Sequence, residues 1–317
     1  MIDGTGRIDK ARGTWYSTLM SGPCVAIVRG RGVRPRGGRV SAPILDRMYD
    51  RGLRLIAGQA GAAEALRTIF SPLDKVGIKI NAIAGPELTS PPDVVLPFAR
   101  LFARLGIAER DVVVWDRTNR ELRAAGYALN AAGSGFRILG TDTAGLGYEA
   151  EPLAHRGIAS RFSAVLTGLV TASVSFAVLK DHGLAGVTAG LKNYFGAIHN
   201  PNKYHDDNCD PAVAEVFDAP PVRTRHRLTV LDALVVQFHR GPSYHAAWAE
   251  PLETLIFGTD PVAVDAVGAR IVERLRKAKG LPTLEEDGRP PRYIPTAERL
   301  GLGRAAASDI RILEEDV

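Results

Sequence analysis

The stretch between Lys180 and Pro211 concentrates side chains that can carry out acid–base and anion chemistry. Lysine ammonium groups bind anions and stabilise developing negative charge, and histidine imidazoles transfer protons near neutral pH. Glycines and the segment Asn-Pro-Asn at 200–202 make the chain turn repeatedly here, so these side chains can converge on one place. We therefore predict an active site in this stretch, with these candidate catalytic residues: Lys180, His182, Lys192, His199 and His205.

Other candidate residues stand at the ends of predicted strands. Lys79 and Asn81 close the apolar run KVGIKIN at 75–81, and Asp116 and Arg117 follow the run DVVVW. In α/β sheets, ligands bind at the carboxyl ends of the strands, where loops lead into helices. We predict that the substrate is bound by Lys79, Asn81, Arg117 and Asn193.

The two histidines of the Asn-Pro-Asn loop also suit a metal site. His199 and His205 flank this helix-breaking segment, and Asp206 offers carboxylate oxygens beside them. Two imidazoles and a carboxylate with open positions suit iron, zinc or manganese, so a divalent transition metal on these three residues is one prediction. The spacing matches no strict metal motif, and a polar surface loop or a catalytic acid/base cluster explains the same residues.

The segment from Gly186 to Asn193 looks like a phosphate-binding loop but departs from the Walker A pattern. Three residues separate its glycines, Leu191 precedes Lys192, and asparagine stands where a serine or threonine would hold magnesium. A glycine turn that starts a helix can still bind an anion through backbone N–H groups, with Lys192 adding charge. The alternative is that the small residues let the helix pack closely on the sheet.

Helical and strand patterns alternate along the chain. Helices are predicted over 43–56 and 60–70, after Ser90-Pro91, after Thr118, within 186–196, from Pro211 and from Pro261; strands are predicted over 75–81, 111–115 and 137–140, up to Lys180, and near 227–238 and 252–257. Thr118 and Glu121 form a capping box, and Ser90, Asp210 and Asp260, each before a proline, are predicted N-caps. The alternation predicts an α/β fold with a mostly parallel sheet, helices on both faces and Rossmann-like layering.

Length and composition fit a folded, soluble protein, with 317 residues of which 45% are hydrophobic and 24% charged. We predict a single α/β domain over 46–317, preceded by an N-terminal extension and basic loop over 1–45. Cys24 and Cys209 are the only cysteines. They exclude a disulfide framework, a zinc knuckle and a cysteine-ligated iron–sulfur cluster, and favour the reducing cytoplasm.

Two further patterns bear on partners. The run from Phe162 to Leu179 has no charged residue over the minimum length of a membrane helix. Its polar and apolar residues alternate toward the end, so we predict a strand with one apolar face and no membrane association. The net charge is +5, and a local cluster of arginines contributes to it: Arg29, Arg31, Arg34, Arg36 and Arg39. No aromatic residues interleave this cluster, which predicts a solvated loop and no nucleic-acid partner.

Several segments together carry a family resemblance. They are VGIKIN (76–81), VLKDHGLAGVTAGLKNYFGAIHNPNKYH (178–205), RLTVLDAL (227–234), FGTDPVAVDAVG (257–268) and AERLGLG (297–303). With them the chain resembles the domain of unknown function 362 family. The resemblance implies one α/β domain whose signature polar residues are Lys180, His182, Lys192 and Asn193. Many relatives also carry a ferredoxin-like cysteine segment or a leader peptide; this chain lacks the cysteines, so we expect no iron–sulfur cluster.

These observations predict an enzyme that acts on a small anionic metabolite. The lysines of the pocket would hold a carboxylate or phosphate, and the histidines would move protons. A bound metal would polarise the substrate or activate oxygen or water, so a metal-dependent oxidoreductase or lyase is one form of this prediction. The alternative is a non-catalytic anion- or metal-binding protein in which the same residues are ligands.

Overall fold

One sheet organises the part of the chain that the computed structural model describes, residues 22–34 and 39–317. Residues 1–21 of the expected extension and Arg36 of the arginine cluster lie outside these ranges. Nine strands of the described residues form the sheet, in the order β11-β1-β10-β9-β7-β2-β3-β4, with β8 paired to β7. The strands are β1 (Cys24–Arg29), β2 (Val76–Lys79), β3 (Val112–Asp116), β4 (Arg137–Gly140), β7 (Ala172–His182), β8 (Gly186–Thr188), β9 (His226–Gln237), β10 (Ala249–Gly258) and β11 (Arg311–Asp316). A separate two-stranded ribbon pairs β5 (Leu153–His155) with β6 (Ile158–Ser160).

The sheet is mostly parallel, as the alternating pattern predicted. Strands β9, β7, β2, β3 and β4 all run in one direction. Strand β10 is antiparallel to both of its neighbours, β9 and β1, while β11 is parallel to β1. The carboxyl ends of β2, β3 and β7 therefore meet at the same edge of the sheet.

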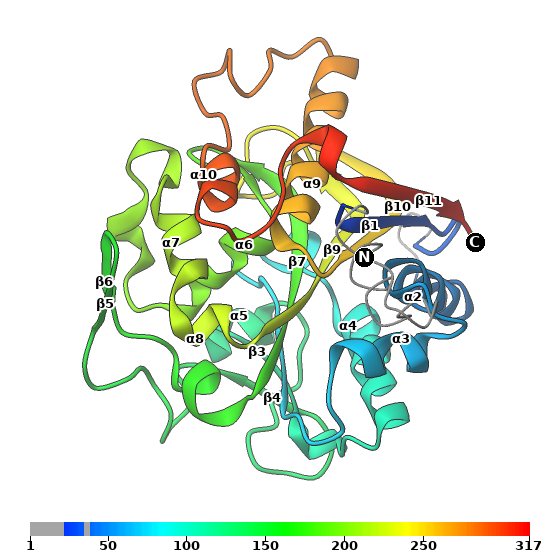
Figure 1. The fold of residues 1–317 in the computed structure, drawn as a ribbon, viewed down its shortest axis with the longest axis vertical. Helices are drawn as coiled ribbons and strands as arrows, with labels where there is room; N and C mark the ends of the chain where they lie inside the picture. The colour runs from blue at the N-terminus through cyan, green and yellow to red at the C-terminus, as the bar shows by residue number, and fades with distance from the viewer. Residues whose placement is uncertain (1–21, 35–38) are drawn as a thin grey trace, which may run out of the picture.

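Helices cover both faces of the sheet, which confirms the α/β fold. One core cluster contains side chains of α2 (Ala42–Ala57), α3 (Ala62–Ile69), α4 (Pro92–Arg100) and α5 (Asn119–Ala124). The other contains side chains of α6 (Gly190–Asn193), α7 (Ala212–Asp218), α8 (Pro220–Arg223), α9 (Pro261–Ala278) and α10 (Tyr293–Arg299). Figure 1 shows α2, α3 and α4 on one side of β7 and α6, α7 and α8 on the other.

Short helical turns complete the connections. The 3-10 turns span Pro86–Leu88, Leu101–Leu105, Glu109–Asp111, Tyr194–Ala197, Pro201–Tyr204, Asp207–Cys209, Ala246–Trp248 and Ala307–Asp309, and a π turn spans Val165–Leu169. None of the helices in the described part of the chain is long and apolar enough to cross a membrane.

Strand β7 differs from the strand with one apolar face that the sequence predicted. All of its residues are buried, and it begins at Ala172, after the π turn. The serines of the alternating pattern face helices instead of solvent: Ser173 lies 2.8 Å from the Tyr194 hydroxyl, and Ser175 donates to the carbonyl of Gly190. A central strand of a covered sheet is buried on both faces, so its polar side chains must find partners within the protein.

The predicted helix caps are confirmed at two of four positions. Ser90 does not cap the helix after it, because α4 begins at Pro92 and Pro91 takes the N-cap position. Thr118 Oγ1 accepts from the N–H of Glu121, and Asp260 accepts from the N–H of Ala263. Asp210 does not cap the helix that follows it. The peptide bond before Pro211 is cis, α7 begins at Ala212, and no side chain caps it.

Strands β1 and β11, at one side of the sheet, are among the strands that were not predicted. Strand β1 lies within the segment 1–45, where we expected an extension, and it pairs with β10 and β11. Its partners are strands from the far end of the chain, and such distant pairing leaves no local pattern. The sheet therefore includes residues that the sequence analysis assigned to the extension.

Candidate functional site

A cavity of about 370 Å³ lies where β2, β3 and β7 end. Its wall includes Lys79, Asn81, Asp116, Arg117, Glu121, Lys180, His182, Thr188, Lys192, Asn193, Phe195, Gly196, Asn202, His205 and Pro242. Parallel strands bring their ends together, which is why residues so far apart in sequence share this wall. The structure thus brings together all but two of the predicted site residues; His199 and Asp206 do not line the cavity.

Lys79 forms a buried ion pair with Asp116. The Nζ atom lies 2.5 Å from Asp116 Oδ1 and also donates to the carbonyl of Ile80 and, at 3.3 Å, to Asn193 Oδ1. Asn193 Nδ2 donates in turn to the carbonyl of Lys79 and to Ser175 Oγ. Asp116 thus balances the charge of Lys79, and Asn193 holds the lysine in place.

Lys180 lacks such a partner. The residue is 1% exposed, and its Nζ atom has no hydrogen-bond partner among the residues that the structure describes. Burial lowers the pKa of Lys180 to about 7, with Asp116 opposing the shift and Lys192 adding to it. Near neutral pH the Lys180 amine is therefore present in both its neutral and its charged form.

Lys192 sits between an aromatic ring and a histidine. Its Nζ atom lies 4.5 Å from the centre of the Phe195 ring and 3.5 Å from His205 Nε2. Burial lowers the pKa of Lys192 to about 8, so most of this side chain is still an ammonium ion at neutral pH. Lys192 is a cation at the cavity wall and forms no ion pair with a carboxylate among the described residues.

The hydrogen bonds of His182 and His205 fix their tautomers. His182 Nδ1 accepts from the N–H groups of Leu184 and Ala185, so the proton of the neutral ring is on Nε2. His205 Nδ1 lies 3.0 Å from the carbonyl of Pro201 and must donate to it, so its Nε2 is unprotonated and its lone pair faces Lys192 Nζ. The two rings stack with centroids 5.8 Å apart. The cavity wall therefore has a hydrogen-bond donor beside a proton acceptor.

Burial keeps both rings neutral. It lowers the pKa of His182 to about 2, and the positive charge of the nearby Lys192 adds to the shift. The pKa of His205 is also lowered, by burial and then by Lys192. His205 is consequently in its basic form at neutral pH.

The structure does not assemble the predicted metal ligands. His199 is exposed and packs its ring against Tyr148, while Asp206 is exposed on the loop. Asn200 adopts a left-handed conformation between His199 and the 3-10 turn at Pro201–Tyr204. Of the three predicted metal ligands, only His205 reaches the cavity. Within residues 22–34 and 39–317, no three His, Cys, Asp or Glu side chains form a group that could hold a metal ion.

The glycine turn before Lys192 holds a carboxylate of the chain itself. The N–H groups of Gly190 and Leu191 donate to the two oxygens of Asp265 on α9, at 2.8 and 3.1 Å. These are the N–H groups that could have bound an external anion, and Asp265 occupies both of them. The alternative of close packing holds: a Cβ atom at Gly190 would lie 2.5 Å from Thr229 Cγ2 and 3.1 Å from Asp265.

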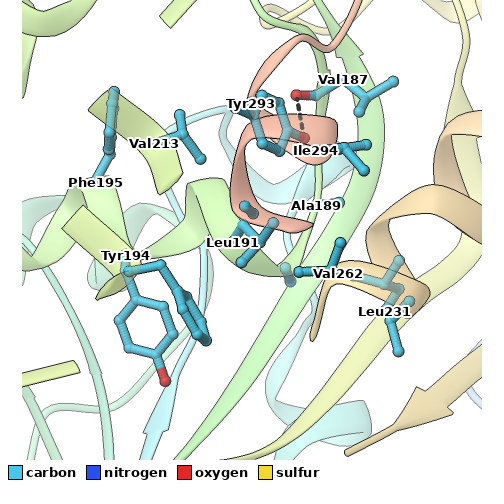
Figure 2. Close-up of a cluster of buried hydrophobic side chains, with 14 of the residues drawn as sticks. Val187, Ala189, Leu191, Tyr194, Phe195, Val213, Leu231, Val262, Tyr293 and Ile294 are labelled. Carbon is cyan, nitrogen blue, oxygen red and sulfur yellow. Dashed lines mark hydrogen bonds between the residues drawn. The ribbon is translucent and has the colours of Figure 1, made fainter. Parts of the chain in front are cut away.

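An apolar cluster supports α6 from the side away from the cavity. Figure 2 shows Leu191 and Tyr194 in this cluster with Val213, Val262 and Ile294. Residues three apart on a helix share a face, so the residues between these two point elsewhere. Lys192 and Asn193 are those residues, and the cluster thereby fixes their direction toward the cavity.

We expect the substitution Asp265→Asn to destabilise the fold by about 1–3 kcal/mol, because a buried N–H of Gly190 or Leu191 loses its acceptor. Urea unfolding of the two proteins measures this difference. Asp93→Asn on the exposed first turn of α4 is the matched control and should stay within about 0.5 kcal/mol of the wild type. Equal stability of both variants would show that Asp265 does not secure α6.

A buried charge network fixes the end of β7. Asp181 is fully buried and accepts from Arg289 Nη1 and from the N–H of Gly241, each at 2.7 Å. Arg276 Nη1 lies 3.6 Å from the same carboxylate. Asp181 lies between Lys180 and His182, so these contacts hold both site residues and bring Pro242 to the cavity wall.

The roles of several residues of this site were not predicted. Asp116 was a candidate because it directly follows the strand DVVVW, but its pairing with Lys79 was not foreseen. Glu121 was recognised only as part of a capping box, yet it also accepts from Arg117 Nη2 at 2.9 Å. Phe195 and Pro242 carried no chemical signal of their own.

Comparisons with known proteins identify a family without an assigned activity. The family model described as "Domain of unknown function (DUF362)" matches residues 76–270, which include every residue that lines the cavity. No curated protein matches the chain. The crystal structure of a Thermotoga maritima protein, a Northeast Structural Genomics Consortium target, is 12% identical with a TM-score of 0.41; the match covers 76% of this chain and 60% of that one. The chain thus spans less than two thirds of that protein.

Proposed function

The chain belongs to the DUF362 family, whose description names no activity, so we propose a function from the cavity. We propose that the cavity is the active site of an enzyme that binds a small anionic metabolite and transfers a proton to or from that metabolite. The observation that carries the proposal is the unpartnered, buried amine of Lys180 beside Lys192 and two histidines of fixed tautomer.

The charges of the cavity wall favour an anion. Lys79 and Arg117 are balanced by their own carboxylates, Asp116 and Glu121. Lys180 and Lys192 remain, and neither has a carboxylate partner among the described residues. A carboxylate or phosphate between them would supply the missing negative charge, and a charge-assisted hydrogen bond in such a site contributes about 1.5–3 kcal/mol.

The histidines supply the proton transfer. His205 Nε2 is unprotonated and can take a proton from a bound substrate, while Nε2–H of His182 can donate a hydrogen bond to an oxygen that becomes negative. Lys192 lies 3.5 Å from His205 Nε2 and can return the proton. These groups together form an acid–base pair beside an anion site.

An enzyme fits these lysines better than a carrier does. A protein that only holds an anion gains most from lysines that stay fully charged. Burial instead brings the pKa values of Lys180 and Lys192 to about 7 and about 8, where proton transfer at neutral pH is most efficient.

Anion binding and proton exchange test the proposal. We expect inorganic phosphate or oxalate to raise the melting temperature of the wild type. We expect Lys192→Met to raise the measured Kd for these anions about 10–100-fold. The control is Lys277→Met, which removes an exposed lysine of α9 and should bind like the wild type. Incubation with pooled carboxylate and phosphate metabolites in heavy water, followed by NMR, should show exchange of a substrate C–H that Lys192→Met loses. Binding without exchange would support the non-catalytic alternative, and equal binding by Lys192→Met would reject the site.

A further inference from the structure

We propose that Lys180 is a nucleophile that forms an imine with the carbonyl carbon of a small 2-oxo acid, whose carboxylate is held by Lys192. This inference rests on the proposed function, since it names the substrate class of the same cavity. It assigns to Lys180 a covalent role in place of simple charge attraction.

The contrast between the two strand-end lysines supports this role. Lys79 and Lys180 lie on neighbouring parallel strands, and each is 1% exposed. Lys79 Nζ has Asp116, Ile80 and Asn193 as partners, whereas Lys180 Nζ has none among the described residues. A buried ammonium without a partner is unfavourable, so the fold favours the neutral amine at Lys180 and not at Lys79. A neutral amine is the form that attacks a carbonyl group.

The surroundings match what imine formation needs. Lys192, a second cation, lines the same cavity and lowers the pKa of Lys180 further, as a neighbouring cation does for other imine-forming lysines. It also offers the charge that holds the carboxylate. His205 Nε2 is a proton acceptor on the same wall. The cavity of about 370 Å³ has room for a small metabolite, and Phe195 contributes an apolar surface.

The covalent step balances without a further reagent. The lone pair of the Lys180 amine forms a bond to the carbonyl carbon. The carbonyl oxygen takes one proton from the amine nitrogen and one from solvent, both passed through His205, and leaves as water with the electron pair of the C–O bond. A protonated imine remains on Lys180. It withdraws electrons from the adjacent carbon, so that His205 can remove a proton there.

Reductive trapping tests the inference. The full chain is incubated at pH 7 with glyoxylate, pyruvate or 2-oxoglutarate and sodium cyanoborohydride, and peptide mass spectrometry then locates the adduct. At pH 7 the neutral fraction of Lys180 exceeds that of an exposed lysine by about 10³-fold. We expect Lys180 to be labelled at least about 10-fold faster than Lys277, and Lys192→Met to slow the labelling without moving it. A Lys180 left unlabelled by all three acids, or labelled no faster than Lys277, overturns the inference.

Oxalate distinguishes this failure from failure of the proposed function. Oxalate has two carboxylates and no ketone or aldehyde, so it can bind between the lysines but form no imine. If oxalate binds with the dependence on Lys192 described above while Lys180 stays unlabelled, the imine is rejected and the anion site is retained. If oxalate does not bind and Lys180 is not labelled, both are rejected.

Discussion

Lys180→Met is expected to make the protein more stable near neutral pH and to abolish imine trapping. Methionine fills a similar volume without the charge, and the buried position offers Lys180 no partner among the described residues. Since the pKa falls from 10.5 to about 7 on folding, and each unit corresponds to about 1.4 kcal/mol, the gain below pH 7 is on the order of 3–5 kcal/mol. A group that destabilises the fold but serves the reaction is typical of active sites.

The pH dependence of this gain has a definite sign. Between about pH 7 and 10.5 the unfolded wild type still binds the Lys180 proton that the folded state has released. The free energy of unfolding of the wild type therefore rises with pH in this window, relative to Lys180→Met. Urea unfolding at several pH values should show the largest difference below pH 7 and almost none above about 10.5. A constant difference, or a less stable variant, would mean that the ammonium finds a partner in the folded protein.

The sequence was informative where short apolar runs end in polar residues. Lys79 and Lys180 each stand at the end of such a run, and parallel strands place these ends together, so most of the cavity wall followed from the pattern. Helix caps next to proline were predictable for the same reason: cap and helix are neighbours in sequence. Asp260 met this expectation. Asp210 did not, because α7 begins at Ala212 and Pro211 takes the N-cap position.

Contacts between distant segments explain what the sequence did not reveal. Asp265 fills the glycine turn at Gly190 from 75 residues away, which turned a candidate anion site into an internal cap. The sequence around Gly190 and around Asp265 contains no pattern that predicts this contact. The predicted metal ligands likewise do not come together, because their placement depends on the path of the loop in three dimensions. His199 and His205 are close in sequence, but the left-handed turn at Asn200 separates their directions, and only three-dimensional placement shows which one reaches the cavity.

Asp116→Ala is expected to cost about 3–5 kcal/mol of stability, the range for breaking a buried ion pair by removing one partner. The side chains of Lys79 and Asp116 are 1% and 5% exposed, so solvent does not replace the lost carboxylate. The N–H of Ala82 also loses its acceptor, Asp116 Oδ2. Chemical unfolding measures the loss. The control is Asp316→Ala, which breaks the exposed pair with Arg31 and should change stability by less than about 1 kcal/mol.

A second substitution separates the lost pair from a general packing defect. Lys79→Met combined with Asp116→Leu removes both charges and should recover most of the stability, because no uncompensated ammonium remains. The single variant should also move the pH profile of Lys180 trapping to lower pH, since the charge of Asp116 raises the pKa of Lys180. An unshifted profile together with a stability loss no larger than that of Asp316→Ala would show that Asp116 neither balances Lys79 nor acts on Lys180. Asp116 therefore acts on both lysines. Its negative charge stabilises the buried ammonium of Lys79, and the same charge raises the pKa of Lys180.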